Sequence, residues 1–440
     1  MRLRTVGFAA FAAAAIMQSC QPACTPAPPV PAPVTVPVIP PAPPPVTTIV
    51  VEGQGNGHGR GLSAWGAYGM AVNAGVPWWQ ILDHYYGGTT NAPAPNAPVR
   101  IRLMALDDAG VVGIVSLGRT ATWNGATYGS LHFYEVAPNR YDVYGTSDVS
   151  CPGGGTGWVM VAQAVPGPFT VSTPHDESVA PAGDVLGLCQ PNGSVVHYRG
   201  TLTITEDASG ANRVVDTLLT ENYVRGVVSR EVASSWGAAG GGAGMNALYA
   251  MAVAARSFAF AQGRYPYADT CDTSSCQVYG GAAYRSSAQA PTSHPTVRVC
   301  EVGNLTFECA TTDRAVGDTA GVVRVWQSNG AIISGEYSAS HGPRSAGGTY
   351  PPVEDTASNV PQNTLYRWTR NVDAATVAAT YGLGTLTGAR TERDPSTIYD
   401  GVWGHRVVLT GTAGSATVSA WDFRNAFGLP SPGFTILGVV

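Results

Sequence analysis

The chain contains no lysine among its 440 residues, so all 24 of its basic side chains are arginines. Charged residues account for only 12% of the chain and the formal net charge is -5, which provides no basic surface for nucleic acid. Beyond the first residues no apolar run is long enough to span a bilayer, and no sequence period indicates a repeat protein. These absences argue against nucleic-acid-binding, membrane-spanning and repeat proteins. The 44% of hydrophobic residues can fill a large core.

The first residues indicate export. Arg2 and Arg4 precede an apolar run over residues 7–17, which has the length of a signal-peptide core and is too short to cross a membrane permanently. We therefore expect a signal peptide at residues 1–20 and a secreted or cell-envelope protein. Cys20 loosely resembles a lipoprotein attachment site, so a lipid anchor at this residue is the alternative to free secretion.

A proline-rich stretch follows the expected leader. Residues 21–48 are nearly free of charge and rich in proline, which is typical of an extended linker. Residues 49–440 then form the expected folded domain.

The cysteines of an exported protein fold in an oxidising compartment, where they usually pair. Downstream of the expected linker their number is even, and pairing between sequence neighbours predicts three disulfides. The predicted pairs are Cys151–Cys189, Cys271–Cys276 and Cys300–Cys309.

The order of the predicted elements indicates a mixed fold. Between residues 99 and 204, short β-prone runs alternate with Gly, Pro, Asn and Asp, as in a β meander. Two helices are expected over residues 220–232 and 246–260. Strand-like alternation returns at residues 322–337 and 406–421. Helices grouped in the middle of an otherwise β chain predict an α+β fold and not a parallel α/β sheet.

The first of these helices places a carboxylate where apolar side chains belong. Val224, Val227 and Val228 share one helical face. Glu231 follows Val224 by seven residues, so it lies on the same face. Burial raises the pKa of a carboxyl group, which suits a group that donates a proton near neutral pH. A buried ion pair with an arginine explains this position equally well, so the spacing alone leaves both roles open.

Motifs around Glu231 occur in a characteristic order. They occupy residues 220–232, 246–260, 271–281, 337–342 and 418–424. The order resembles the SpoIID/LytB family, named for stage II sporulation protein D and the amidase enhancer. Residues 57–71 and 79–89 also resemble a Gly-His-Gly element of this family. In many members this element lies at the C-terminal end of the domain, whereas here it lies at the N-terminal end. Because domain termini commonly lie close together, we expect the element to pack at the same place in the fold.

The resemblance implies a peptidoglycan lytic transglycosylase-like enzyme that acts on glycan strands, with Glu231 as the catalytic residue. One carboxyl can donate a proton to the leaving sugar and then accept one from the C6 hydroxyl of N-acetylmuramic acid, which closes a 1,6-anhydro ring. Two alternatives stay open. The first is a noncatalytic wall-binding module that enhances a cell-wall amidase partner, and the second is ordinary hydrolysis.

The same resemblance provides the other candidate site residues, which are expected to bind or support the substrate. They are His58, Arg256, Gln277, Tyr279, Tyr337, Ser338 and Ser340. Each has a simpler structural explanation. His58 could stabilise a turn, Arg256 could form a buried ion pair that orients a catalytic carboxylate, and aromatic residues such as Tyr279, Trp65 and Trp79 could belong to the core.

No cofactor is expected. Some relatives are thought to hold zinc with the Cys-Asp-x-x-x-Cys segment and a nearby histidine. Here Ser275 precedes Cys276 where that histidine is expected, so a Cys271–Cys276 disulfide is favoured over a zinc site.

Overall fold

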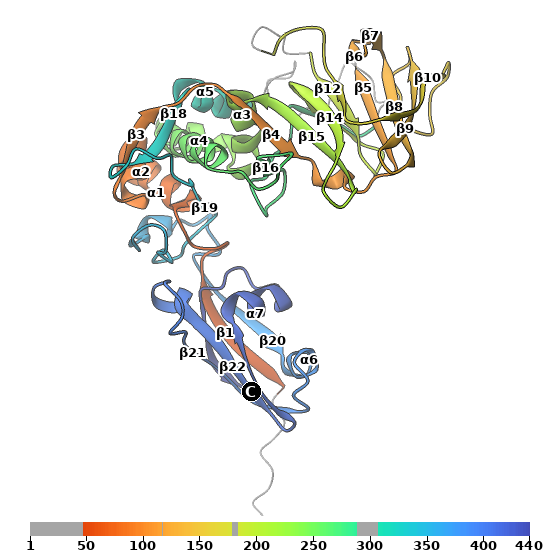
Figure 1. Ribbon diagram of the computed structural model, residues 1–440. Helices are drawn as coiled ribbons and strands as arrows, with labels where there is room; N and C mark the ends of the chain where they lie inside the picture. The colour runs from red at the N-terminus through yellow and green to blue at the C-terminus, as the bar shows by residue number, and fades with distance from the viewer. Residues whose placement is uncertain (1–46, 117, 178–183, 288–306) are drawn as a thin grey trace, which may run out of the picture. The chain divides into compact units, whose positions relative to one another are not determined.

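The computed structural model describes residues 47–440 apart from residue 117 and residues 178–183 and 288–306 (Figure 1). The described residues leave out the predicted signal peptide and nearly all of the predicted linker. The predicted Cys300–Cys309 disulfide also lies outside them, because Cys300 and the side chain of Cys309 are not described. None of the described helices is long and apolar enough to cross a membrane. The described residues contain two large hydrophobic cores.

Helix α4 (Met245–Phe260) lies at the centre of the larger core. Its many alanines are buried and present little side-chain volume, so neighbouring helices can approach it closely. The helices that pack against it are α1 (Ala64–Ala74), α2 (Trp78–Tyr85), α3 (Thr220–Glu231) and α5 (Phe307–Asp318). Figure 1 shows these helices gathered at one end of the β-rich region.

Two mainly antiparallel sheets contain the predicted β meander and extend beyond it. The seven-stranded sheet has the order β10 (Val159–Pro166), β9 (Arg140–Thr146), β8 (Ser130–Ala137), β5 (Val111–Ser116), β12 (Leu186–Cys189), β13 (Val195–Tyr198) and β17 (Ala283–Arg285). The five-stranded sheet has the order β11 (Phe169–Val171), β14 (Thr201–Glu206), β15 (Asn212–Leu219), β4 (Pro98–Arg102) and β16 (Thr270–Cys271), with β16 parallel to β4. Because β15 leads directly into α3, the second sheet fixes the start of the helix that carries Glu231.

The second core belongs to a region that we call the C-terminal lobe, defined as β1 and residues 367–440. Its first sheet has the order β20 (Arg367–Asp373), β1 (Thr48–Gln54) and β24 (Phe434–Val439), so the first described strand is central. Its second sheet contains β21 (Leu386–Arg393), β22 (His405–Gly411) and β23 (Gly414–Ser419). Helices α6 (Ala374–Thr380) and α7 (Ala420–Phe427) complete the lobe.

Short elements connect these regions. The strands are β2 (Leu62–Ser63), β3 (Thr89–Pro93), β6 (Ala121–Trp123), β7 (Ala126–Tyr128), β18 (Val322–Trp326) and β19 (Tyr337–Ser338). The 3-10 helices are η1 (Met104–Leu106), η2 (Ser234–Gly242), η3 (Thr356–Ser358) and η4 (Gly401–Gly404). Strand β19 pairs in parallel with β2, which joins the Gly-His-Gly element to the Tyr337 segment.

The α+β fold class is confirmed, and both predicted central helices are present within one residue of their expected ends. The expectation that helices would be confined to the middle of the chain is wrong. Helices α1 and α2 lie in the Gly-His-Gly element, and α7 begins at Ala420 inside a segment predicted as a strand. Ser419 explains this last difference, because its side chain accepts a hydrogen bond from the Asp422 N–H and caps a new helix.

Candidate active site

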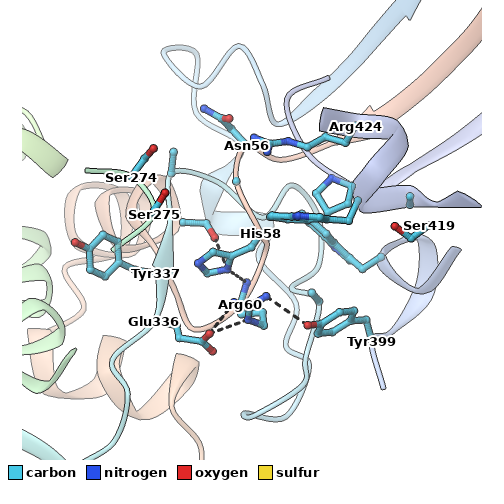
Figure 2. Close-up of a pocket in the computed structure, with 18 of the residues that line it drawn as sticks. Asn56, His58, Arg60, Ser274, Ser275, Glu336, Tyr337, Tyr399, Ser419 and Arg424 are labelled. Carbon is cyan, nitrogen blue, oxygen red and sulfur yellow. Dashed lines mark hydrogen bonds and ion pairs between the residues drawn. The ribbon is translucent and has the colours of Figure 1, made fainter. Parts of the chain in front are cut away.

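A cleft of about 900 Å³ lies between Glu231 and the C-terminal lobe (Figure 2). Three parts of the chain form its walls: the region around Glu231, the turn that follows β1, and the C-terminal lobe. The lining residues used below are Asn56, His58, Arg60, Glu231, Arg264, Cys276, Val278, Glu336, Tyr337, Ser338, Asp394, Tyr399, Trp403, Trp421 and Arg424. The cleft therefore brings together residues that are far apart in the sequence.

Glu231 is the last residue of α3, and its side chain lines the cleft. The three valines of the same face are fully buried, as the spacing predicted. The backbone N–H of Val278 donates a hydrogen bond of 2.9 Å to Glu231 Oε1. Burial raises the pKa of Glu231 and outweighs the Val278 N–H and the Tyr337 hydroxyl, which lower it. The negative end of the helix dipole also disfavours the carboxylate at this position.

Tyr337 lies beside Glu231 and a buried polar cluster. Its hydroxyl is close enough to Glu231 and Gln277 to affect their electrostatics, but it forms no hydrogen bond with a described residue. Gln277 is only 1% exposed, and its Oε1 accepts a hydrogen bond of 2.8 Å from the Tyr223 hydroxyl. Gln277 therefore belongs to the buried polar cluster and does not line the cleft.

His58 faces the cleft from the glycine-rich turn after β1. Its Nδ1 accepts a hydrogen bond of 3.0 Å from the Arg60 N–H and lies 3.1 Å from Ser338 Oγ. Burial lowers the pKa of His58 to about 3, so the ring is neutral at physiological pH. Because Nδ1 accepts from a backbone N–H, the ring proton is on Nε2. His58 can therefore act as a neutral hydrogen-bond donor.

The turn that carries His58 requires glycine beside it. Gly59 has a φ of 76°, which favours glycine. A Cβ at this position would also lie 2.6 Å from the Trp403 ring. The Gly59 N–H in turn donates a hydrogen bond of 2.9 Å to Ser338 Oγ. Ser338 therefore holds the turn in place, in addition to contacting His58.

The C-terminal wall contains residues that sequence reasoning did not select. Trp403 donates a hydrogen bond of 2.9 Å from Nε1 to the Arg344 carbonyl. Trp421 is 42% exposed and lies beside Arg424. Figure 2 shows Tyr399 and Arg424 across the His58 turn from Tyr337. The resemblance of residues 418–424 was the signal that could have identified Trp421 and Arg424.

Arg256 does not contact Glu231 and does not line the cleft. Its side chain is fully buried, and it donates to both carboxylate oxygens of Glu221, at 2.9 Å from Nε and 2.7 Å from Nη2. The expected buried ion pair is therefore present, but its carboxylate is not the candidate catalytic one. Sequence spacing did not reveal this partner, because Glu221 lies one helix earlier in the first turn of α3.

Four other candidates also lie outside the cleft lining. Tyr279 is buried and donates a hydrogen bond of 2.9 Å to Asp216 Oδ2, so it belongs to the core. Ser340 is fully buried and accepts a hydrogen bond of 2.9 Å from Asn363. Trp65 packs against Trp236, with ring centres 4.7 Å apart, and Trp79 is 47% exposed elsewhere on the surface.

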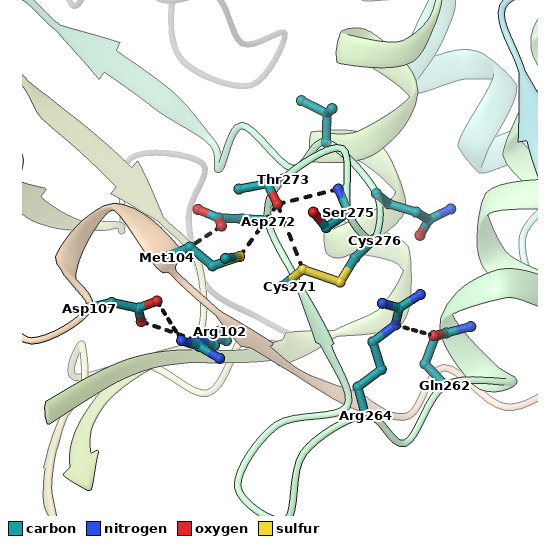
Figure 3. Close-up of a disulfide and its surroundings, with 12 residues drawn as sticks. Arg102, Met104, Asp107, Gln262, Arg264, Cys271, Asp272, Thr273, Ser275 and Cys276 are labelled. Atoms are coloured by element: carbon teal, nitrogen blue, oxygen red, sulfur yellow. Dashed lines mark hydrogen bonds and ion pairs between the residues drawn. A yellow bond between two sulfur atoms is a disulfide. The ribbon is translucent and has the colours of Figure 1, made fainter. Parts of the chain in front are cut away.

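The structure joins Cys271 to Cys276 and Cys151 to Cys189, the same two pairs as the sequence-local pairing. The Cys271–Cys276 disulfide closes the loop just before Val278 (Figure 3). Since both sulfurs are bonded to each other, they do not fit the zinc site of some relatives, which needs thiolates. Within the described part of the chain, no group of three or more His, Cys, Asp or Glu side chains is placed to hold a metal ion.

Comparison with protein families finds that residues 208–326 match the SpoIID family, described as stage II sporulation protein. This segment contains Glu231, Arg256 and the Cys271–Cys276 disulfide. Comparisons with curated proteins and with solved structures give no match. The SpoIID match is consistent with a cell-wall-related role, and together with the disulfides it fits an extracellular or envelope protein. The match supports the resemblance to the SpoIID family over residues 208–326, the segment that contains Glu231.

Proposed function

We propose that this protein is a peptidoglycan lytic transglycosylase in which Glu231 acts first as an acid and then as a base. The proposal is supported by the surroundings of the Glu231 side chain in the cleft. Its carboxyl group is half-buried, has a raised pKa and receives one backbone N–H. A carboxyl that stays protonated closer to neutral pH can protonate a glycosidic oxygen.

The proposed reaction begins with proton transfer from Glu231 to the glycosidic oxygen after N-acetylmuramic acid. The bond between the anomeric carbon and this oxygen breaks, and positive charge develops on the muramic acid ring. The muramic acid C6 hydroxyl then attacks the anomeric carbon and gives its proton to the Glu231 carboxylate. Glu231 returns to its protonated form, and the products are a free 4-hydroxyl sugar and a 1,6-anhydro sugar.

Two other carboxylates, Glu336 and Asp394, line the cleft and are candidates for the second carboxylate of a hydrolase. Glu336 forms an ion pair of 2.7 Å with Arg60, and Asp394 accepts hydrogen bonds from the backbone and side chain of Ser396. Each carboxylate uses one oxygen in these contacts, and Glu336 Oε2 has no hydrogen-bond partner among the described residues, so the products decide between the two reactions. Hydrolysis by either common mechanism requires such a second carboxylate beside the acid.

The remaining walls of the cleft suit a sugar chain. The ring of Trp421 provides an apolar surface for the C–H face of a sugar, and Tyr399 adds a second ring with a polar end. Neutral His58 provides a hydrogen-bond donor without a competing charge. Peptidoglycan glycan strands are therefore the proposed substrate, and the exported location implied by the first residues would place the enzyme beside them.

The identity of the products tests the proposal. Purified protein is incubated with peptidoglycan glycan strands, and the products are analysed by mass spectrometry. We expect 1,6-anhydro-N-acetylmuramic acid ends, which are lighter by one water than hydrolysis products. Reducing muramic acid ends would show a hydrolase instead. Wall binding without any cleavage would support the noncatalytic amidase enhancer.

A further inference from the structure

Arg424 brings a positive charge to the cleft wall formed by α7. Its guanidinium lies 5.2 Å from the centre of the Trp421 ring. Nε donates a hydrogen bond of 3.1 Å to the Leu429 carbonyl, and Nη1 donates one of 2.9 Å to Asn425 Oδ1. These two bonds fix the plane of the guanidinium and leave Nη2 without a protein acceptor in the part of the chain that the structure describes. The donor group is therefore ordered in advance of any ligand.

The charge of Arg424 is not balanced by the protein. Within the described ranges no carboxylate forms an ion pair with it, whereas Arg60 in the same cleft is paired with Glu336. The nearby Asp422 accepts a hydrogen bond of 2.7 Å from the Ser419 hydroxyl at the start of α7. Burial lowers the pKa of Arg424 with no anion to offset it. A partly desolvated cation of this kind is stabilised when an anion binds.

The proposed substrate carries anions of the matching kind. A guanidinium binds carboxylates through paired N–H groups. Each muramic acid unit has a lactyl carboxyl group, which is free in a bare glycan and forms an amide when a stem peptide is attached. The stem peptide then provides carboxylates of its own. A chain of N-acetylglucosamine alone has no carboxylate, so this group distinguishes peptidoglycan from other glycans of the same sugar type.

We propose that Arg424 and Trp421 form a carboxylate-selective subsite, in which Arg424 binds a carboxylate of the muramic acid unit or its peptide and Trp421 packs on the adjacent sugar. This inference rests on the proposed function, because it assigns the substrate group that the C-terminal wall recognises. Arg424 is a binding residue here and takes no part in proton transfer.

Calorimetric binding to the full chain tests the subsite without turnover. All measurements use the Glu231→Gln background. The first probe is the tetrasaccharide of alternating N-acetylglucosamine and N-acetylmuramic acid with free lactyl carboxylates, and the second is chitotetraose. We expect the first probe to bind about tenfold more tightly, because a charge-assisted hydrogen bond contributes that much. Adding Arg424→Gln should remove this preference and leave chitotetraose binding nearly unchanged.

A third probe distinguishes the two sources of the carboxylate. This is the same tetrasaccharide with stem peptides attached. If Arg424→Gln weakens only the free lactyl form, the lactyl carboxylate is the ligand. If it weakens only the peptide-bearing form, the ligand is a peptide carboxylate. Arg370→Gln is the matched control, because Arg370 is exposed on β20 of the same lobe and does not line the cleft.

Several results would overturn the subsite. The first is equal affinity of Arg424→Gln and its parent for every probe, and the second is a loss of chitotetraose binding in Arg424→Gln as large as its loss of carboxylate binding. The third is a similar loss of carboxylate binding in Arg370→Gln, and the fourth is no detectable binding of any carboxylate probe. Arg424→Lys keeps the charge and should retain part of the preference, which separates recognition from misfolding. The result is independent of the reaction, since carboxylate selectivity can be present in a protein that never cleaves and absent from one that does.

Discussion

The two ends of α3 each carry a half-buried glutamate, and the surroundings of the two side chains differ. Glu221 lies in the first turn, where the helix dipole favours a negative charge, and it is paired with Arg256. Glu231 is the last residue, where the dipole opposes a negative charge, and among the described residues it receives a hydrogen bond only from the Val278 N–H. The same residue type is therefore paired with a cation at one end of the helix and has a raised pKa at the other end.

This difference bears on the two roles that the sequence left open. A glutamate on an apolar helix face is compatible with either an ion pair or an acid, and α3 contains one glutamate with an arginine partner and one without such a partner among the described residues. The buried arginine of α4 binds Glu221 and also donates a hydrogen bond of 3.0 Å to the Val322 carbonyl. Glu231 is left with dipolar partners, as the proposed acid requires.

The largest expected effect is on stability at the Glu221 end. Replacing Arg256 with methionine leaves the Glu221 carboxylate partly buried without its cation, which should lower the free energy of unfolding by about 3–5 kcal/mol. Urea denaturation measures this change. The control Arg264→Met removes an exposed arginine that makes no ion pair with described residues, and it should change stability by less than about 0.5 kcal/mol. Equal stability of Arg256→Met and the parent protein would contradict the comparison.

The next effect is on activity at the Glu231 end. Glu231→Gln keeps the shape of the side chain but removes the acid, so turnover of glycan strands should fall by at least about two orders of magnitude. The free energy of unfolding should remain close to that of the parent. Glu52→Gln, on an exposed position of β1, is the matched control and should keep full activity. A folded Glu231→Gln protein with normal turnover would end the assignment of Glu231 as the acid.

A smaller effect is expected from the loop that supplies the Val278 N–H. Replacing Cys271 and Cys276 with serine should destabilise the protein by about 2 kcal/mol, because the closed loop is short, and should also reduce turnover. The same change at Cys151 and Cys189 should reduce stability but not turnover, since neither residue lines the cleft. Chelator should leave the activity unchanged. Inhibition by chelator, with both Cys271 and Cys276 recovered as free thiols, would show a metal site instead.

The smallest effect is the pH dependence of stability. The pKa of Glu231 is raised in the folded protein, so the folded state holds its proton more tightly than the unfolded state does. This contribution is complete below the ordinary pKa of glutamate and is lost as the pH rises through the folded pKa. As the pH rises through the folded pKa of Glu231, the Glu231→Gln protein should therefore gain stability relative to the parent protein. Parallel stability curves across the whole pH range would indicate an unperturbed Glu231.

The sequence predicted the structural features that a single segment of the chain determines. Helical spacing predicted α3 and placed Glu231 on the face of its valines because both depend on residues within two turns. Close cysteines likewise indicated the Cys271–Cys276 pair. The role of Tyr279 was not predictable in this way. Its ring packs where Gly226 has no side chain, and a Cβ on Gly226 would lie 2.4 Å from that ring. Such a contact depends on two distant segments.

The C-terminal wall of the cleft was missed for the same reason. Trp403, Trp421 and Arg424 share a cleft with Glu231 only because the tertiary structure brings the C-terminal lobe to it. The resemblance of residues 418–424 marks the segment of Arg424 but does not place it beside Glu231. The absence of a carboxylate partner became visible only when the charges of all described neighbours were known.

The central position of β1 has a consequence for the order of folding. Val51 pairs with Arg370 on one side and Ile436 on the other, so this sheet cannot form until residues near the C-terminal end of the chain are available. Pairings of such long sequence separation form late. In a chain that is made from its N-terminus, the helical core around α4 can assemble first. The His58 turn, which directly follows β1, then reaches its place only as the last strands arrive, so the cleft is completed at the end of folding.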